Sequence, residues 1–135
     1  MTDRVRDAMV AEPPQLDGSA TAQEAGEALA RPEVRALFVC EAGRLIGIVT
    51  RKTLVREVVA AGLDPRSTPV RDIAEVPENT IDSEVPLDEG FRFLEEHDLD
   101  RVAVVDGGKL VGVLSRAVVQ RRLAEDEPPA DVDGS

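Results

Sequence analysis

The sequence is poor in aromatic and in metal-binding side chains. Its 135 residues include no tryptophan or tyrosine, three phenylalanines, one cysteine and one histidine. A single cysteine cannot close an internal disulfide, and Cys40 and His97 are too few ligands for a zinc site made by the protein alone. The core must therefore consist of Val, Leu, Ile and Ala, and the lone cysteine is typical of a reducing compartment such as the cytoplasm.

Long apolar runs and net positive charge are also missing. No run approaches the roughly eighteen apolar residues of a membrane span, and the charged start MTDRVRDAMVAEPP lacks the apolar stretch of a signal peptide. The net charge of -11 opposes binding to nucleic-acid phosphates or to anionic lipids, because like charges repel. We expect a soluble cytoplasmic protein with neither nucleic acid nor membrane as partner.

The motifs of catalysis are absent as well. No nucleophile stands beside a base, and there is no glycine-rich phosphate loop and no metal-ligand spacing. Cys40 lies among Leu37, Phe38 and Val39, which favours a buried small hydrophobe over a redox role. We expect the protein not to be an enzyme and to require no cofactor.

What the chain does contain is an internal repeat without gaps. VRD at 5–7 recurs at 70–72, and GRLIGIVTR at 43–51 recurs as GKLVGVLSR at 108–116, so one offset of 65 residues relates both pairs. Conservative exchanges such as Ile46/Val111 and Thr50/Ser115 follow the same register. A shared offset over this length indicates a duplicated unit.

Each copy shows the same order of elements. β-rich runs at 36–41 and 44–50, and again at 101–106 and 109–115, predict two hairpins that turn at Ala42-Gly43 and Gly107-Gly108. Helical patterns cover 21–32, 51–62, 86–97 and 116–126, and Gly62 is a candidate C-cap for the second of them.

These elements predict the domain organisation. We expect repeat 1 at 1–62, a linker at 63–69, repeat 2 at 70–125 and a disordered acidic tail at 126–135. One unit cannot bury a hairpin and two helices alone, so two copies should pack together. The expected fold is α/β (α+β), with two βαββα repeats related by a pseudo-two-fold axis, their sheets packed together and their helices outside.

The repeated motifs resemble a known family. The opening VRDAM, a Val-rich strand that ends in an acid, a Gly-[RK]-[LI]-hydrophobic-Gly hairpin and a Thr or Ser at the strand end resemble the tandem CBS-domain pair, or Bateman module, over residues 5–124. The resemblance implies a stand-alone regulatory module that senses AMP, ADP, ATP or S-adenosylmethionine in clefts between the repeats. It also implies a homodimer formed through the CBS helices.

One family signature is incomplete in both repeats. In ligand-binding members a [ST]-x-x-D motif follows the last strand, where the hydroxyl contacts phosphate and the Asp binds both ribose hydroxyls. The matching residues are Thr50 to Thr53 and Ser115 to Val118, so the hydroxyl survives twice and the Asp is lost twice. Each charge-assisted hydrogen bond lost is worth roughly 1.5–3 kcal/mol. The cleft with Thr53 should be the less damaged one.

The resemblance also implies the candidate ligand-binding residues. A first cleft would hold Leu16, Asp17, Ala20, Thr50, Thr53 and, from across the axis, Arg101; a second would hold Ile81, Asp82, Val85, Ser115 and Val118. Arg51 and Arg116 begin predicted helices, where backbone N–H groups favour phosphate.

Ordinary structural roles compete with each of these assignments. Thr50 and Ser115 are typical N-caps, Arg51 and Arg116 suit a solvated helix start, and Arg101 could pair with Asp98 or Asp100. Two functions therefore stay open: the nucleotide sensor, and a degenerate, ligand-free module for dimerisation or protein interaction. Either one is compatible with regulation of an unidentified partner protein.

Overall fold

The computed structural model describes residues 3–11 and 13–126. The predicted tail therefore lies outside the described residues, except for Asp126. Within the described ranges, no helix combines the length and the apolar composition that crossing a membrane requires.

Two βαββα units follow each other along the chain, as predicted. The first contains β2 (Gln15–Asp17), α2 (Ala22–Leu29), β3 (Leu37–Glu41), β4 (Arg44–Val49) and α3 (Arg51–Leu54). The second contains β5 (Thr80–Asp82), α4 (Leu87–Glu96), β6 (Arg101–Asp106), β7 (Lys109–Ser115) and α5 (Arg116–Asp126). In each unit the first strand runs parallel to the second, and the second and third strands form an antiparallel hairpin. The expected fold class and both hairpins are confirmed.

The two hairpins match in detail. Ala42 and Gly43 turn the first with φ of 54° and 82°, and Gly107 and Gly108 turn the second with φ of 61° and 84°. Two successive residues with positive φ suit the twist of a two-residue hairpin loop. The strand register also shifts at the same place, after Val39 in one hairpin and after Val104 in the other.

Helix α3 departs from the predicted helix 51–62. Thr50 is its N-cap, as its side chain accepts a hydrogen bond from the Thr53 N–H at 3.2 Å, so the capping role expected for Thr50 is confirmed. The α-helix ends at Leu54 and continues as a π-helical turn over Val55–Val59. The Ala60 N–H donates to the Val55 carbonyl at 2.8 Å, and Gly62, with φ of 73°, follows as the predicted stop.

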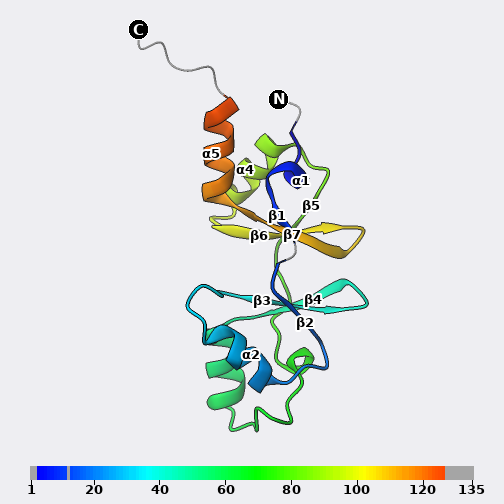
Figure 1. The fold of residues 1–135 in the computed structure, drawn as a ribbon, viewed down its shortest axis with the longest axis vertical. Helices are drawn as coiled ribbons and strands as arrows, with labels where there is room; N and C mark the ends of the chain where they lie inside the picture. The colour runs from blue at the N-terminus through cyan, green and yellow to red at the C-terminus, as the bar shows by residue number, and fades with distance from the viewer. Residues whose placement is uncertain (1–2, 12, 127–135) are drawn as a thin grey trace.

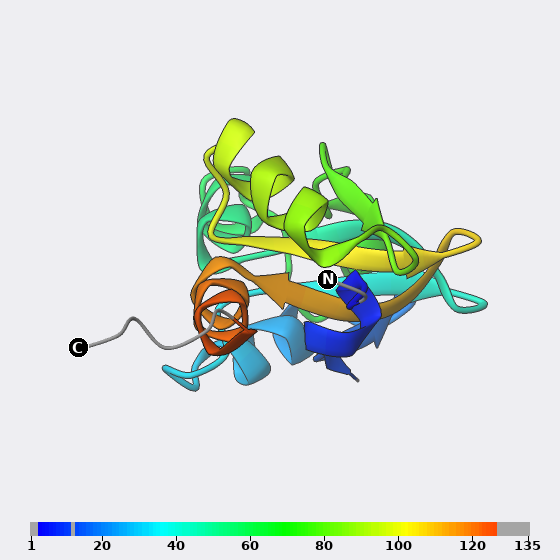
Figure 2. The same ribbon diagram turned by 90° about the horizontal axis from the view of Figure 1, so that it is seen from above.

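The two units stack along the long axis of the molecule, with their sheets facing each other and the helices outside (Figures 1 and 2). The hairpin tips lie side by side, where Arg44 pairs with Lys109. This pairing joins the strands into one path, β2-β3-β4-β7-β6-β5. The helices therefore cover the outer faces, while the inner faces meet across the middle.

Each half has its own aliphatic core. In the first half the buried residues are Ala25, Leu29, Leu37, Val39, Val49 and Val70. In the second half they are Val5, Ala8, Ile81, Leu87, Leu94, Val102, Val104, Leu114 and Val119. Val70 opens the second repeat and Val5 opens the first, so each of these residues is buried in the other half.

The opening segments of the two repeats are thus exchanged. Helix α1 (Val5–Ala8) lies against α4 and α5, and a 3₁₀ turn at Val70–Asp72 lies against β4. The Val5 N–H donates to the Val85 carbonyl at 2.8 Å, and the Val70 N–H donates to the Ala20 carbonyl at 2.7 Å. Both donors and both acceptors are related by the offset of 65. The duplicated unit in the sequence and the packed half in space therefore have different boundaries along the chain.

Two glycines make room for the exchanged segments. A Cβ on Gly47 would lie 2.5 Å from the Cβ of Ala74, and one on Gly112 would lie 2.6 Å from the sulfur of Met9. Beyond these contacts β1 (Val10–Ala11) pairs with β7, and Glu75 forms a bridge with Ile48. After β1 and after Glu75 the chain continues along the space between the two halves.

Candidate functional site

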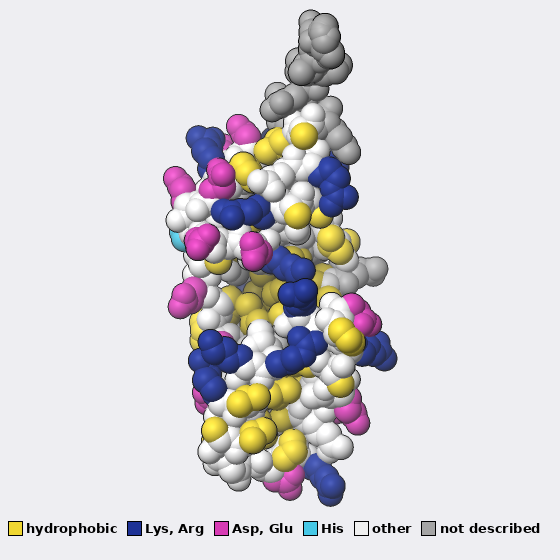
Figure 3. Space-filling model, turned by 90° about the vertical axis from the view of Figure 1, so that its left-hand side faces the viewer, with side chains coloured by type: hydrophobic (Ala, Val, Ile, Leu, Met, Phe, Trp, Pro, Cys, Tyr) yellow, Lys and Arg dark blue, Asp and Glu magenta, His cyan; other side chains and the backbone are white. Residues whose placement is uncertain are grey.

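A cavity of about 830 Å³ lies between the two halves. Figure 3 shows one of its openings as a hollow with hydrophobic side chains inside. The volume falls in the range of small-molecule sites. Strands from both hairpins and the chain that follows each exchanged segment form its walls. Its apolar lining includes Val10, Val34, Ala36, Phe38, Ile48, Val76, Pro77, Leu99, Val102, Ala103, Val113 and Val118.

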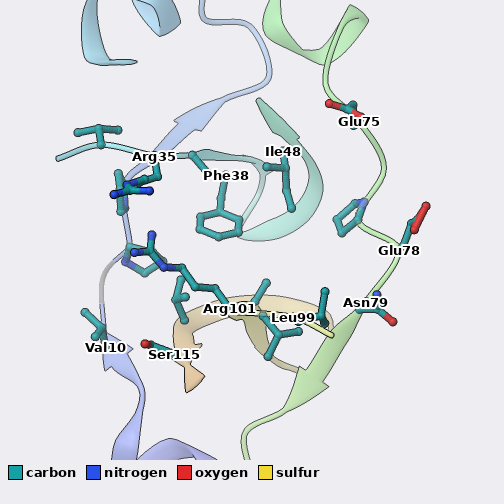
Figure 4. A pocket seen from close by; sticks show the side chains of 18 of the residues that line it. Val10, Arg35, Phe38, Ile48, Glu75, Glu78, Asn79, Leu99, Arg101 and Ser115 are labelled. Carbon is teal, nitrogen blue, oxygen red and sulfur yellow. The ribbon is translucent and has the colours of Figure 1, made fainter. Parts of the chain in front are cut away.

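Two arginines line one side of this cavity. Arg35 precedes β3 and Arg101 begins β6, and Figure 4 shows their side chains on the same side of the space. Among the described residues no ion pair includes either of them. The pairing of Arg101 with Asp98 or Asp100 that the sequence left open is therefore not formed. Guanidinium groups that lie outside these ion pairs are available to hydrogen-bond an anionic ligand.

Two glutamates stand on the other side of the cavity. Glu75 and Glu78 lie on the segment that leads to β5, across from the arginines in Figure 4. The Thr53 hydroxyl donates to Glu75 Oε2 at 2.7 Å, and Arg56 Nη2 donates to Glu75 Oε1 at 3.0 Å. The hydrogen bond from Thr53 is the largest cause that lowers the pKa of Glu75, and the positive charge of Arg56 acts in the same direction. Glu75 is therefore ionised at neutral pH.

Three of the predicted ligand residues line the cavity. Arg101 and Ser115 face each other across the β6–β7 ladder, and Val118 follows in α5. Thr50 and Thr53 do not line it, because they are occupied in the N-terminal turn of α3 and Thr53 is fully buried.

The two predicted helix-start arginines hold backbone carbonyls. Arg51 Nη2 donates to the carbonyls of Arg31 and Val34 at 2.8 Å each, and Arg116 Nη2 donates to the Leu94 carbonyl at 3.3 Å. Neither side chain lines the cavity. In both repeats this arginine ties the start of the last helix to the region where the preceding helix ends, a structural role shared by the two copies.

The remaining six predicted residues lie away from the cavity. Leu16 and Ala20 pack against the first core, and Ile81 and Val85 belong to the second. Asp17 accepts from the Ser19 hydroxyl at 2.6 Å, which lowers the pKa of Asp17, and Asp82 accepts from the Glu84 N–H at 2.8 Å. These side chains close turns after β2 and β5, the outermost strands of the sheet path.

Several cavity residues were missed in the sequence. Phe38, Ile48, Val76 and Glu75 were not among the predicted ligand residues, and Glu75 and Val76 lie outside every motif that carries the resemblance. One signal was nevertheless present at the offset of 65: Thr53 and Glu75 correspond to Val118 and Val10, so two polar residues become apolar together.

No metal site is apparent in the described part of the chain, which contains no group of three or more His, Cys, Asp or Glu side chains that could hold an ion. Cys40 is a buried free thiol whose pKa is raised by desolvation. The thiol is therefore protonated and packed in β3.

Paired βαββα units with exchanged openings and a cavity between them define a module of two repeats. The CBS domain model matches residues 5–60 and 67–125, so the chain belongs to the CBS-domain family. The tandem CBS pair predicted from the sequence is thereby confirmed.

Known relatives share this fold. Hypoxic response protein 1 of Mycobacterium tuberculosis is 30% identical over 106 residues, which cover 78% of this chain and 74% of that protein. The crystal structure of hypoxic response protein I with two coordinated zinc ions has a TM-score of 0.75 at 28% identity, covering 89% of this chain and 98% of that one.

Two further structures are similar over most of the chain. CBSX2 in complex with AMP has a TM-score of 0.71 at 24% identity, covering 90% of this chain and 96% of that one, a likeness that shows the fold. The hexameric CBS-CP12 protein from bloom-forming cyanobacteria has a TM-score of 0.65 at 25% identity, covering 98% of this chain and 79% of that one. CBS-pair relatives thus include a nucleotide complex and an oligomer.

Proposed function

We propose that this chain is a regulatory CBS pair that binds an adenosine-containing ligand, AMP, ADP, ATP or S-adenosylmethionine, in the cavity between its halves. The observation that carries the proposal is the cavity itself, whose lining combines an apolar middle with two arginines and three glutamates. The AMP held by CBSX2, a protein of the same fold, supports this class of ligand.

The cavity suits the chemistry of such a ligand. A purine base can bury its faces against side chains such as Phe38, Ile48 and Val113, while the phosphate or carboxylate of the ligand meets Arg35 and Arg101. A charge-assisted hydrogen bond to an arginine is worth about 1.5–3 kcal/mol. The lining also holds Glu33, Glu75 and Glu78, so binding of an anion here rests on direct contact with the two guanidinium groups and not on the net charge of the cavity.

The position of the cavity gives such a ligand a regulatory effect. Its walls come from both hairpins and from the chain that follows each exchanged segment, so a ligand would contact the two halves at once. A ligand that binds one relative arrangement of the halves more tightly shifts the population toward that arrangement. A partner that contacts the outer helices would sense this shift.

Calorimetric titration with the four ligands, together with thermal melting, tests the proposal. We expect at least one ligand to bind and to raise the melting temperature, because ligand at a hundred times its Kd stabilises the folded state by about 2.7 kcal/mol. Absence of heat and of any melting shift at millimolar concentrations of all four would overturn the proposal.

The zinc ions of the hypoxic response protein are not part of this proposal. No suitable cluster of ligands occurs within residues 3–11 and 13–126. Loss of nucleotide binding on treatment with a chelator would contradict this separation.

A second candidate function is self-association without a ligand. Val55, Val59 and Leu63 are 57%, 73% and 45% exposed, and Val59 and Leu63 line a groove of about 500 Å³ beside α2. The residues related to Val55 and Val59 by the offset of 65 are Gln120 and Ala124, so the apolar surface lies on the first half. The hexameric CBS-CP12 protein supports oligomer formation in the family.

Light scattering tests this second candidate. A homodimer through this groove should dissociate when Val59 is changed to Lys, because a desolvated charge opposes burial. A wild-type protein that stays monomeric at tens of micromolar would exclude the dimer.

A further inference from the structure

One end of the cavity differs chemically from the other. In the first half the Thr53 hydroxyl contacts the carboxylate of Glu75, whereas Val118 and Val10 stand at the corresponding positions of the second half. The backbones are equivalent, since Glu75 is bridged to Ile48 as Val10 is paired with Val113. Valine thus stands in the second half at the positions of both polar residues, which indicates that the two polar residues act as a pair.

Thr53 has no hydrogen-bonding capacity left for a ligand. A hydroxyl has one proton and two lone pairs. The Thr53 hydroxyl gives its proton to Glu75 at 2.7 Å, so it must accept from the Thr50 N–H and the Thr50 hydroxyl, both 3.0 Å away. The side chain is also fully buried. Thr53 therefore supports Glu75 and does not itself reach the cavity.

Glu75 does have capacity left. Its two oxygens offer about four acceptor directions, of which Thr53 uses one on Oε2 and Arg56 uses one on Oε1. The side chain is 49% exposed and lines the cavity. Each oxygen can accept a further hydrogen bond, so the carboxylate is suited to two neighbouring hydroxyl groups.

Hydrogen bonds from Thr53 and Arg56 hold this carboxylate in place. Arg56 lies in the π-helical turn, whereas the corresponding part of the second half belongs to the α-helix α5. A π-helical turn inside a helix often marks a functional site. Glu75 Oε2 is also within 2.7 Å of Thr53 Oγ1, the atom that stands at the place of the missing motif Asp. The exchanged segment thus delivers a carboxylate to the position where the repeat has lost its own.

We propose that Glu75 binds the vicinal 2′- and 3′-hydroxyls of a ribonucleotide at the first-half end of the cavity, and that the second-half end, with Val10 and Val118, binds no ribose. This inference rests on the proposed nucleotide function. It predicts that the site binds a ribonucleotide more tightly than a deoxyribonucleotide, and that each chain has one ribose site.

Calorimetric titration with AMP and with 2′-deoxy-AMP tests the inference. Because one charge-assisted hydrogen bond is lost with the 2′-hydroxyl, the wild-type protein should bind AMP roughly tenfold more tightly than the deoxy analogue. The variant Glu75→Gln should bind both with similar, weaker affinity.

Glu41→Gln serves as the matched control, because Glu41 also pairs with an arginine, Arg71 at 3.0 Å, but does not line the cavity. This variant should keep the wild-type ratio. Equal affinity of the wild-type protein for the two nucleotides, or an unchanged ratio in Glu75→Gln, would overturn the role of Glu75 while leaving nucleotide binding intact. No binding of either nucleotide by the wild-type protein would instead overturn the proposed function and this inference with it.

Discussion

The first half of the molecule meets the cavity with a carboxylate, and the second half meets it with two valines. Apart from this difference the halves are closely matched: their hairpin turns, their register shifts and their close glycine contacts coincide at the offset of 65. The features that match all position the backbone. The features that differ include side chains that line the space between the halves, the π-helical turn that follows α3, and the exposed Val55 and Val59.

The exchanged segments explain why the backbone has stayed alike. Gly47 and Gly112 each lie against a segment from the other repeat, with no space for a Cβ. A change of shape in one half would therefore disturb the packing of the other. The cavity side chains carry no such mutual constraint, so their chemistry is free to differ between the halves.

The largest expected effect is on stability, and it tests whether the two exchanged valines contribute equally to the packing of the halves. Val5→Ala and Val70→Ala each remove two buried methyl groups, and each should lower the free energy of unfolding by about 2 kcal/mol. Urea unfolding measures the loss. Hydrogen exchange should then show faster opening of α4 and α5 in Val5→Ala, and of α2 and β3 in Val70→Ala.

Val76→Ala is the control for these two variants, because Val76 is 78% exposed and its truncation should change stability by less than about 0.5 kcal/mol. If Val5→Ala loosened α2 and left α4 protected, the exchanged packing would be disproved.

A smaller effect concerns the basic side of the cavity. Arg101 has Ala36 as its counterpart at the offset of 65. Arg101→Ala should weaken nucleotide binding roughly tenfold, because one charge-assisted contact is lost from a partly solvated site. Ala36→Arg, which gives the first half a similar base, should strengthen binding several-fold. Isothermal titration measures both, and equal affinity of Arg101→Ala and the wild-type protein would remove Arg101 from the site.

The smallest effect concerns the dependence of stability on pH. The pKa of Glu75 is lowered on folding by its hydrogen bond from Thr53. Its stabilising contribution is therefore present above the ordinary pKa of about 4.3 and is lost as the pH falls through the lower, folded pKa. Since Glu75 is half exposed, we expect only a few tenths of a kcal/mol after solvent screening.

The measurement compares the free energies of unfolding of the wild-type protein and Glu75→Gln at pH 7 and near pH 3. The difference between the two proteins should shrink on acidification, whereas titration of Asp17 affects both proteins alike and cancels. A difference that is constant over this range would show that Glu75 is not preferentially ionised in the folded state.

The hairpins and the pairing of the repeats could be predicted because their signals are local. Two-residue turns, alternating β-rich runs and a single offset specify neighbouring backbone. The exchange of Val5 and Val70 could not be predicted in this way, since the alignment shows that these residues are equivalent without showing which half each one joins.

The candidate site was only partly predictable. Arg101, Ser115 and Val118 were identified by their motif positions and do line the cavity. The sequence does not distinguish whether Leu16 and Ile81 are ligand residues or core residues, because an apolar side chain after a turn fits a binding site and a core equally well. Glu75 was missed because its partner Thr53 lies 22 residues earlier in the chain, and a contact over that distance depends on tertiary packing.

The exchanged openings also determine how the chain can be divided. A cut within residues 63–69 would separate the two copies in the sequence, yet it would leave Val5 on a fragment whose partner needs it for its core, and Val70 likewise. Such a cut would yield two mutually dependent fragments, each completed by a few residues of the other. We therefore expect the pair, and not either repeat alone, to be the unit that folds.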